Sequence, residues 1–207
     1  MRKLSLILMA IIVSITAYGI GYPQNVIWEK TYGGVNNDLG KSVRQTTDGG
    51  FIVVGATWVS DNYDIWLLKL DPNGNIVWEK TYGEGEKDIP YTIRQTDDNG
   101  FIILGITASF GTIGQDFLLI KTDSLGNTEW IQTYGGSGYD DGRNVEQTSD
   151  KGYILAGFST SFDSSFDAML VKTDSLGNMQ WYKNYSFSDY LHPFGDYAQH
   201  AIQTSDG

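Results

Sequence analysis

The 207-residue sequence contains no cysteine. No disulfide framework can support the fold, so its stability has to come from packing. Basic residues are scarce as well, because 14 Lys and Arg stand against 25 Asp and Glu and the formal net charge is −11. Such a surface repels phosphate backbones, which argues against a nucleic-acid partner. No segment after residue 25 shows the 3.6-residue apolar period of an amphipathic helix, so we expect few helices.

The N-terminus carries a long apolar run. Arg2 and Lys3 precede it, and small residues in an A-x-G pattern close it at positions 17–19. These features predict a secretory signal peptide over residues 1–19 and a short linker over 20–25. An uncleaved anchor stays open as the alternative, because the run nearly reaches the roughly 20 residues that span a bilayer. After cleavage we expect the protein to be secreted or held at the cell surface, and not to be an integral membrane protein.

Repetition dominates the rest of the sequence. The segment "WEKTYGG" at 28–34 returns as "WEKTYGE" at 78–84, and weaker copies begin at Trp130 and Trp181. Further residues recur at fixed distances from the first three tryptophans: a Gln 17 residues later and a Gly ten residues after that. These positions are Gln45, Gln95 and Gln147, and Gly55, Gly105 and Gly157. A repeat of this length predicts an architecture built from similar units.

Each repeat is expected to contain four strands. In the first repeat they cover residues 41–46, 50–57, 64–71 and 75–83. The second strand, "GFIVVGAT", is apolar on both faces and should be buried. The fourth alternates, with Trp78, Lys80 and Tyr82 on one face, and should lie half-exposed at a sheet edge. Units of four strands repeated about every 50 residues are typical of a β-propeller, so the expected fold class is all-β, with blades of four antiparallel strands.

The turns between the third and fourth strands are rich in aspartate. They read "DPNGN" in the first repeat and "DSLGN" in the next two. One interpretation is a calcium site, but an EF-hand loop needs more ligand positions and a terminal bidentate Glu. The other is a hairpin in which Asp caps the turn and Gly74, Gly126 or Gly177 takes the left-handed position, and we favour it.

The combined pattern W-x-K-T-Y-G-G, Q-T-x-D-G-G-F-I-V-x-G and K-x-D-x-x-G-N resembles the repeats of secreted bacterial and archaeal β-propeller proteins, in particular the group described as seven-bladed bacterial propeller repeats. The resemblance covers nearly all of the chain after the apolar run. It implies a secreted or cell-surface module, often part of a longer protein and mostly without an assigned activity. The turn "LDPNGNIVW" also resembles the docking motif of quinoprotein propellers and, more loosely, the Asp-box of sialidases.

The expected propeller over 26–207 is incomplete. Its parts are an outer strand at 26–33, three blades at 38–83, 88–135 and 140–185, and the start of a further blade at 196–207. Three blades and a piece do not close an ordinary ring, since propellers have four to eight blades. We therefore expect either a fragment of a longer protein, closed through the strand at 26–33, or self-association of several chains.

Several polar residues are candidates for a site. Asp38, Asp88 and Asp140 begin the inner strands and would be nearest the propeller axis, where they could serve a glycan hydrolase or merely anchor the strand ends. Two histidines lie beside carboxylates in an enlarged segment of the fourth repeat: His192 and His200, with Asp189 and Asp196. These could form a metal site, but their spacing matches no metal motif, so a solvated loop is preferred. Arg44, Arg94 and Arg143 belong to the repeat and are not expected to converge as the arginines of a sialidase do.

Two classes of function follow. The preferred one is a non-catalytic binding or adhesion module that presents its loops, including 58–63, to a glycan or a cell-surface protein. The alternative is a propeller enzyme that hydrolyses glycans, which would need an asymmetric pair of carboxylates in different environments. No catalytic, metal-binding, cofactor-binding or ligand-binding residue is assigned by the sequence, and no cofactor is expected.

Overall fold

The computed structural model describes residues 27–110, 114–162, 166–186 and 195–205. The expected signal peptide and linker, 1–19 and 20–25, lie outside the described residues. So do His192 and Asp189.

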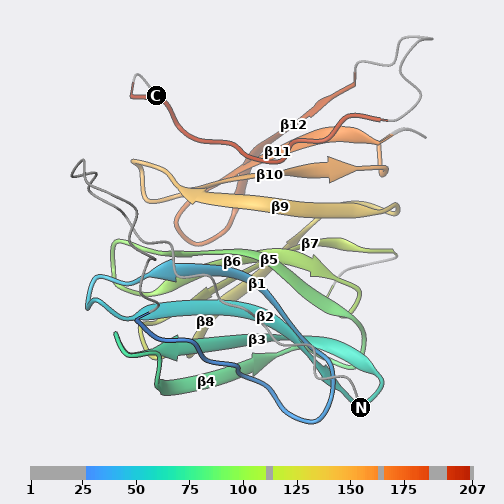
Figure 1. Ribbon diagram of the computed structural model, residues 1–207. Helices are drawn as coiled ribbons and strands as arrows, with labels where there is room; N and C mark the ends of the chain where they lie inside the picture. Colours follow the sequence, from blue (N-terminus) through green and yellow to red (C-terminus); the bar gives the residue numbers. More distant parts are fainter. Residues whose placement is uncertain (1–26, 111–113, 163–165, 187–194, 206–207) are drawn as a thin grey trace, which may run out of the picture.

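Within these residues, twelve strands form three four-stranded antiparallel sheets, which follow one another along the chain (Figure 1). Sheet 1 contains β1 (Asp38–Gln45), β2 (Phe51–Val59), β3 (Asn62–Leu70) and β4 (Ile76–Tyr82). Sheet 2 contains β5 (Asp88–Gln95), β6 (Phe101–Thr107), β7 (Asp116–Thr122) and β8 (Thr128–Tyr134). Sheet 3 contains β9 (Asp140–Gln147), β10 (Tyr153–Ser159), β11 (Asp167–Thr173) and β12 (Met179–Tyr185). No helix occurs among the described residues, so the all-β prediction and the four strands per repeat are confirmed.

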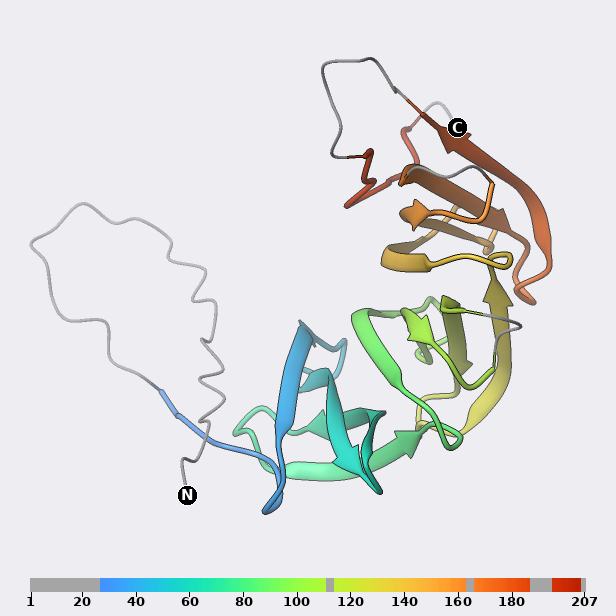
Figure 2. The same ribbon diagram turned by 90° about the vertical axis from the view of Figure 1, so that its right-hand side faces the viewer.

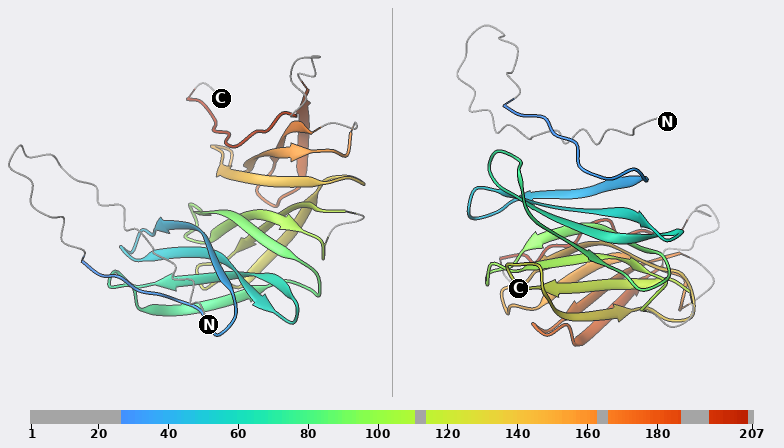
Figure 3. Two further views of the ribbon diagram at one scale, coloured as in Figure 1. Left: turned by 45° about the vertical axis from the view of Figure 1, so that its right-hand side comes forward. Right: turned by 90° about the horizontal axis from the view of Figure 1, so that it is seen from below.

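The three sheets stand face to face along an arc (Figure 2). The first strand of each sheet, β1, β5 or β9, lies on the concave side of the arc, and the fourth strand lies on the convex side. We call β1, β5 and β9 the inner strands. Two further views show sheet 1 and sheet 3 at the two ends of the arc, with sheet 2 between them (Figure 3).

Apolar side chains fill the two seams between the sheets. At the first seam, residues of β2 and β3 such as Ile52 and Leu67 pack against residues of sheet 2 such as Ile103 and Leu118. At the second seam, Leu104 and the rest of the facing side of sheet 2 pack in the same way against sheet 3. Central strands such as β6 are therefore buried on both faces, as their unbroken apolar sequence predicts.

The outer strand of one sheet also contacts the turn of the next sheet. The Trp78 ring lies so close to Gly126, in the β7–β8 turn, that a Cβ atom there would be 2.8 Å from it. The Tyr82 hydroxyl donates a hydrogen bond of 2.7 Å to the Gly126 carbonyl oxygen, and Lys80 reaches Asn127 at 3.3 Å. We call this set of contacts the clamp. It explains why the W-x-K-x-Y motif recurs and why its three side chains share the less exposed face of β4.

The clamp occurs twice more. Trp130 and Tyr134 of β8 contact Gly177 of sheet 3. Before β1, Trp28 lies against Gly74, and the Tyr32 hydroxyl donates to the Gly74 carbonyl oxygen at 2.7 Å.

Residues 27–33, the described part of the outer strand expected at 26–33, thus hold the clamp position on sheet 1 but pair with no strand in the described structure. A β-ladder requires a neighbouring strand, and sheet 1 is already complete without this segment. Residues 196–205, the described part of the segment 196–207 that was expected to begin a further unit, likewise have no strand assignment. They lie along sheet 3, where the Ala198 amide donates to the Gly157 carbonyl oxygen at 3.1 Å.

The Asp-rich turns are capped hairpins, as predicted. In the first, the Asp71 carboxylate accepts hydrogen bonds from the backbone amides of Asn73 and Asn75, at 2.9 and 2.8 Å. Gly74, Gly126 and Gly177 have φ angles of 74°, 76° and 78°, in the left-handed region that favours glycine.

A buried lysine joins the other turn of each sheet to its centre. Lys69 of β3 is 2.8 Å from the Asp48 carboxylate in the β1–β2 turn. This hydrogen bond, followed by that from Thr46, lowers the pKa of Asp48 to about 2. Lys121 with Asp98 and Lys172 with Asp150 repeat the arrangement.

Candidate functional site

Each inner strand contains a β-bulge at the same position of the repeat. Lys41, Tyr91 and Arg143 have no partner in the ladder with the second strand, while the residues on either side of each are paired. A bulge re-aims a side chain and often lies next to a functional site. Here the bulged residue of each inner strand is one with a long side chain.

The bulge also explains the glycine within each second strand. A Cβ atom on Gly105 would overlap the carbonyl oxygen of Ile89, just before the bulge, and Gly55 and Gly157 are equally close to β1 and β9. Only glycine leaves room for this approach of two backbones.

The bulge side chains form a continuous row across the three sheets. The ammonium group of Lys41 lies 5.5 Å from the centre of the Tyr91 ring. The guanidinium carbon of Arg143 lies 4.3 Å from the same ring and 5.4 Å from the Phe158 ring. These are distances of cation–π contacts. We call Lys41, Tyr91 and Arg143 the bulge row.

A second row lies three residues further along the inner strands and consists of Arg44, Arg94 and Glu146. Arg94 donates from Nε to Glu146 Oε1 at 2.8 Å, and from Nη1 to Thr92 Oγ1 at 2.9 Å. His200 Nε2 is 3.5 Å from the same Glu146 oxygen. We call Arg44, Arg94 and Glu146 the arginine row, and the two rows together the concave surface.

Arg44 is the exception in its row. It donates to the Val43 carbonyl oxygen at 2.9 Å, as Arg94 does to that of Ile93. No acidic side chain of the described residues lies within ion-pair distance of Arg44. Partial desolvation of its largely exposed side chain, and next the positive charge of Arg94, lower the pKa of Arg44, while Glu146 acts in the opposite direction. The first seam therefore has an arginine at both of the positions where the second seam has Arg94 and Glu146.

A buried carboxylate, that of Asp141, accepts a hydrogen bond from the arginine of the bulge row. Asp141 is fully buried, at a repeat position where β1 and β5 carry Leu39 and Ile89. Its Oδ2 atom accepts a hydrogen bond of 2.8 Å from Arg143 and lies 3.4 Å from the hydroxyls of Tyr91 and Tyr139. Burial raises the pKa of Asp141, and the charge of Arg143 opposes the shift. Among the described residues, Asp141 Oδ1 has no hydrogen-bond partner.

Aromatic rings gather beside this buried pair at the end of sheet 3. The Phe158 ring contacts Tyr139, Phe166 and Tyr197 at centroid distances of 5.9, 5.6 and 4.8 Å. Tyr139, Phe166 and Tyr197 are each about two-fifths exposed, at 38, 40 and 45%. The concave surface thus ends in a partly exposed aromatic cluster.

Of the aspartates proposed to lie nearest the axis, Asp88 and Asp140 lie at the seams, and Asp38 lies at the uncovered face of sheet 1. Asp88 and Asp140 are fully buried. Asp88 Oδ2 accepts hydrogen bonds from Ser109 Oγ at 2.9 Å and the Glu84 amide at 3.3 Å, and Asp140 has equivalent bonds from Ser161 and Gly136. Asp38 Oδ2 accepts from the Gly34 amide at 2.9 Å. These carboxylates hold the loops that lead into the inner strands, which is the structural role considered above.

The other sequence candidates are spread out. His200 contacts Glu146, whereas the backbone amide of Asp196 donates a hydrogen bond of 2.6 Å to the Phe166 carbonyl oxygen. In the described part of the chain, no group of three or more His, Cys, Asp or Glu side chains is arranged to hold a metal ion. The three arginines all lie on the concave surface. Arg44 and Arg94 belong to the arginine row and Arg143 to the bulge row, and sequence reasoning did not foresee the bulge at Arg143.

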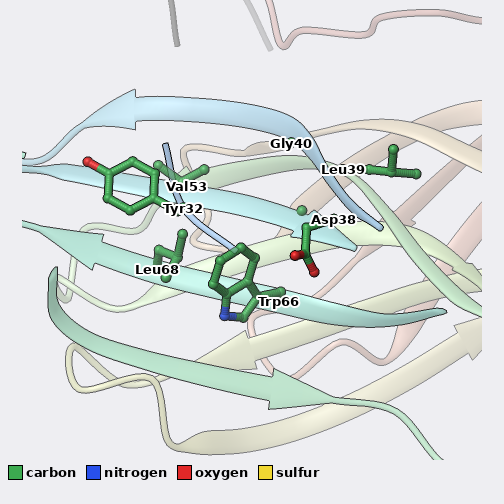
Figure 4. A pocket seen from close by; sticks show the side chains of 8 residues that line it. Tyr32, Asp38, Leu39, Gly40, Val53, Trp66 and Leu68 are labelled. Carbon is green, nitrogen blue, oxygen red and sulfur yellow. The ribbon is translucent and has the colours of Figure 1, made fainter. Parts of the chain in front are cut away.

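Two depressions lie at sheet 1. One, of about 310 Å³, is open and is lined by Val35, Asn36, Asn37 and by Trp58 of the expected ligand-presenting loop 58–63. The other is lined by Tyr32, Leu39, Val53, Trp66 and neighbouring residues (Figure 4).

The second depression has room for about 10 Å³, roughly one water molecule. Its residues lie on the face of sheet 1 that corresponds to the buried face of sheet 2 at the first seam. We therefore interpret this depression as part of a sheet face that no further sheet covers in the described structure, and not as a ligand pocket.

Comparison with known proteins gives no further identification. No family model matches the chain, and no curated protein matches it. The described part of the chain contains no candidate membrane-spanning helix.

Proposed function

We propose that this protein is a secreted or cell-surface β-propeller repeat module, which binds a ligand at its concave surface without transforming it. The observation that carries this proposal is the contrast between seam and concave surface. The seams use apolar residues at the same positions of each repeat, whereas the bulge row changes in chemical character from Lys41 to Tyr91 to Arg143. Side chains that a scaffold does not constrain are available for recognition.

Three features support a propeller. The sheets have four antiparallel strands in sequence order, they follow an arc, and successive seams share the clamp. Residues 27–33 contact sheet 1 through Trp28 and Tyr32 as the outer strand of a preceding blade would. The repeat pattern that resembles secreted propeller proteins agrees with these features.

On this proposal, a further blade covers the free face of sheet 1 and pairs with residues 27–33. The blade comes from a longer chain or from self-association, the two possibilities that the sequence leaves open. Sedimentation of the full-length protein separates them, because a closed single chain is monomeric at all concentrations and an assembly is not.

The alternative function, glycan hydrolysis, has no specific observation in its favour. Its proposed carboxylates, Asp88 and Asp140, are buried at the seams and hydrogen-bonded to neighbouring loops.

A glycan array followed by a turnover assay tests the proposal. The expected result is binding of a defined group of glycans by the full-length protein, with no release of reducing sugar from them. Tyr91→Ala should abolish binding, while Tyr182→Ala, which removes an exposed tyrosine from the outer strand β12, should not.

Reducing-sugar release that disappears in an Asp88→Asn variant would overturn the module in favour of the enzyme. Binding that survives Tyr91→Ala unchanged would show that the ligand surface lies elsewhere.

A further inference from the structure

Arg94 shows which kind of partner an arginine takes at the repeat position that Arg44 also occupies. Arg94 and Arg44 occupy the same position of the repeat, and each donates from Nη1 to the carbonyl oxygen of the preceding residue. Arg94 then reaches across the second seam to a carboxylate, Glu146. The first seam joins β1 to β5 as the second joins β5 to β9, because the Thr47 amide donates to Gln95 Oε1 at 2.9 Å and the Asp97 amide to Gln147 Oε1 at 3.0 Å. Across the first seam, the position equivalent to Glu146 is therefore occupied by Arg94.

This arrangement is unfavourable without a ligand. Two like charges at adjacent positions repel one another, and Arg94 cannot turn away because Glu146 and Thr92 hold it in place. The chain has no shortage of acidic residues, with 25 Asp and Glu against 14 Lys and Arg. A carboxylate at position 94 would have matched Arg44 as Glu146 matches Arg94. Departures from local consistency of this kind concentrate at functional sites.

A second cation lies on the same strand. Lys41 is exposed, and no acidic side chain of the described residues is within ion-pair distance of it. Its charge faces the Tyr91 ring. The edge of the concave surface on β1 therefore has two positive charges that nothing in the described structure compensates, on a protein of net charge −11.

Building on the proposed function, we propose that the concave surface binds an acidic saccharide, whose carboxylate pairs with Arg44 and Lys41. The carboxylate takes the place at Arg44 that Glu146 takes at Arg94. Arginine suits this role because its planar fork matches the two oxygens of a carboxylate.

The neighbouring residues favour a saccharide over an acidic peptide. Tyr91 adjoins Lys41 on the surface, and the exposed rings of Tyr139, Phe166 and Tyr197 continue it at the far end of the bulge row. Aromatic rings offer flat apolar faces with a polar edge, which fit the C–H face and the hydroxyls of a sugar ring. Asp141 fixes Arg143 between two rings, so this part of the surface is rigid before a ligand arrives.

The test is titration calorimetry with the full-length protein and three probes. They are an oligogalacturonate, a neutral oligosaccharide of equal length, and a polyglutamate of equal charge. We expect the oligogalacturonate to bind most tightly and to weaken as salt is raised from 50 to 500 mM, because exposed charges are screened.

Two variants with the same charge change separate the site from the net charge. Arg44→Gln should weaken oligogalacturonate binding about tenfold or more, the usual cost of losing a hydrogen bond to a charged partner. Lys183→Gln, on the outer strand β12, should leave binding unchanged. Arg44 is exposed, so the variant should fold, and an unchanged thermal midpoint verifies this.

Equal binding of the neutral oligosaccharide would overturn the carboxylate assignment and leave the binding module standing. Equal binding of polyglutamate would overturn the saccharide assignment, since charge alone would then suffice. Binding of none of the probes would overturn the inference, while the glycan array would still decide the proposed function.

Discussion

The clamp contacts are made at the two internal seams, but the equivalent side chains at the end of sheet 3 are exposed. Trp78 and Trp130 lie against glycines of the following sheet, whereas Trp181 and Tyr185, at the same positions of β12, remain 43 and 44% exposed. The residues are of the same type and the strands are alike. The difference shows that the motif gains its contacts from the neighbouring turn and not from its own sheet.

The largest effect should come from removing the tryptophan of an internal clamp. Trp78→Ala deletes the ring between β4, Phe101 and Gly126, and truncation of a large aromatic that packs on a core costs about 3 to 5 kcal/mol of unfolding free energy. The matched control is Trp181→Ala, which should cost about 1 kcal/mol or less because, among the described residues, no turn of a following sheet lies against its ring. Chemical denaturation measures both, and equal losses would show that the clamp contributes nothing.

A smaller effect should follow from adding a methyl group at the bulge. In Gly105→Ala the new Cβ overlaps the Ile89 carbonyl oxygen, so two strands must separate, which costs about 1 to 3 kcal/mol. Gly34→Ala is the control, because a Cβ there meets no atom within 4 Å. A variant at 105 as stable as the control would mean that the bulge is not held this tightly.

The clamp hydroxyl should contribute less again. Tyr82→Phe leaves the ring and removes the hydrogen bond to the Gly126 carbonyl oxygen, for a loss of about 1 kcal/mol. Tyr185→Phe, at the free end, should change the thermal midpoint little. A midpoint for Tyr82→Phe indistinguishable from that of wild type would argue that water replaces the bond.

The smallest effect concerns the pH dependence of the first seam. Burial and then the charge of Asp88 raise the pKa of Asp64, and burial raises that of Asp88 against its hydrogen bonds. A carboxyl group with a raised folded-state pKa binds its proton more tightly in the folded protein. The seam is therefore more stable below the ordinary carboxyl pKa of about 4 and loses that stability as the pH rises through the folded value.

Asp88→Asn removes one of the two charges and keeps an oxygen to accept the bond from Ser109. Relative to wild type, the variant should gain stability between pH 4 and pH 7. Asp38→Asn, at the uncovered face of sheet 1, should show no such gain. Urea denaturation at the two pH values measures the difference, and a gain in both variants would locate the effect outside the seam.

Much of the fold could be predicted from the sequence because the same strand and turn patterns recur in each repeat. The apolar run of β6 and the alternation around Trp78 gave the correct burial, and the spacing of Asp71 and Gly74 gave the correct turn. These are local properties, since each depends on strand period or turn geometry within a few residues.

The candidate site could not be predicted in the same way. The bulges at Lys41, Tyr91 and Arg143 break the two-residue alternation on which strand reading depends, so the sequence does not show which way these side chains point. Asp141 stands next to Asp140 in the chain, yet one supports Arg143 and the other holds a loop at the seam. The missing signal was available as a departure from the repeat: Asp141 occurs where two other repeats carry Leu39 and Ile89.

The clamp has a consequence for how such a chain can evolve. Its target in the next sheet is a glycine, a carbonyl oxygen and an asparagine, all in a turn that every repeat possesses. A duplicated or deleted unit would therefore meet its new neighbours with matching contacts, so the array can change length by whole units while each junction is preserved. The inner strands make no clamp contacts, so their side chains can change separately in each repeat. New binding specificities can then arise on the same scaffold.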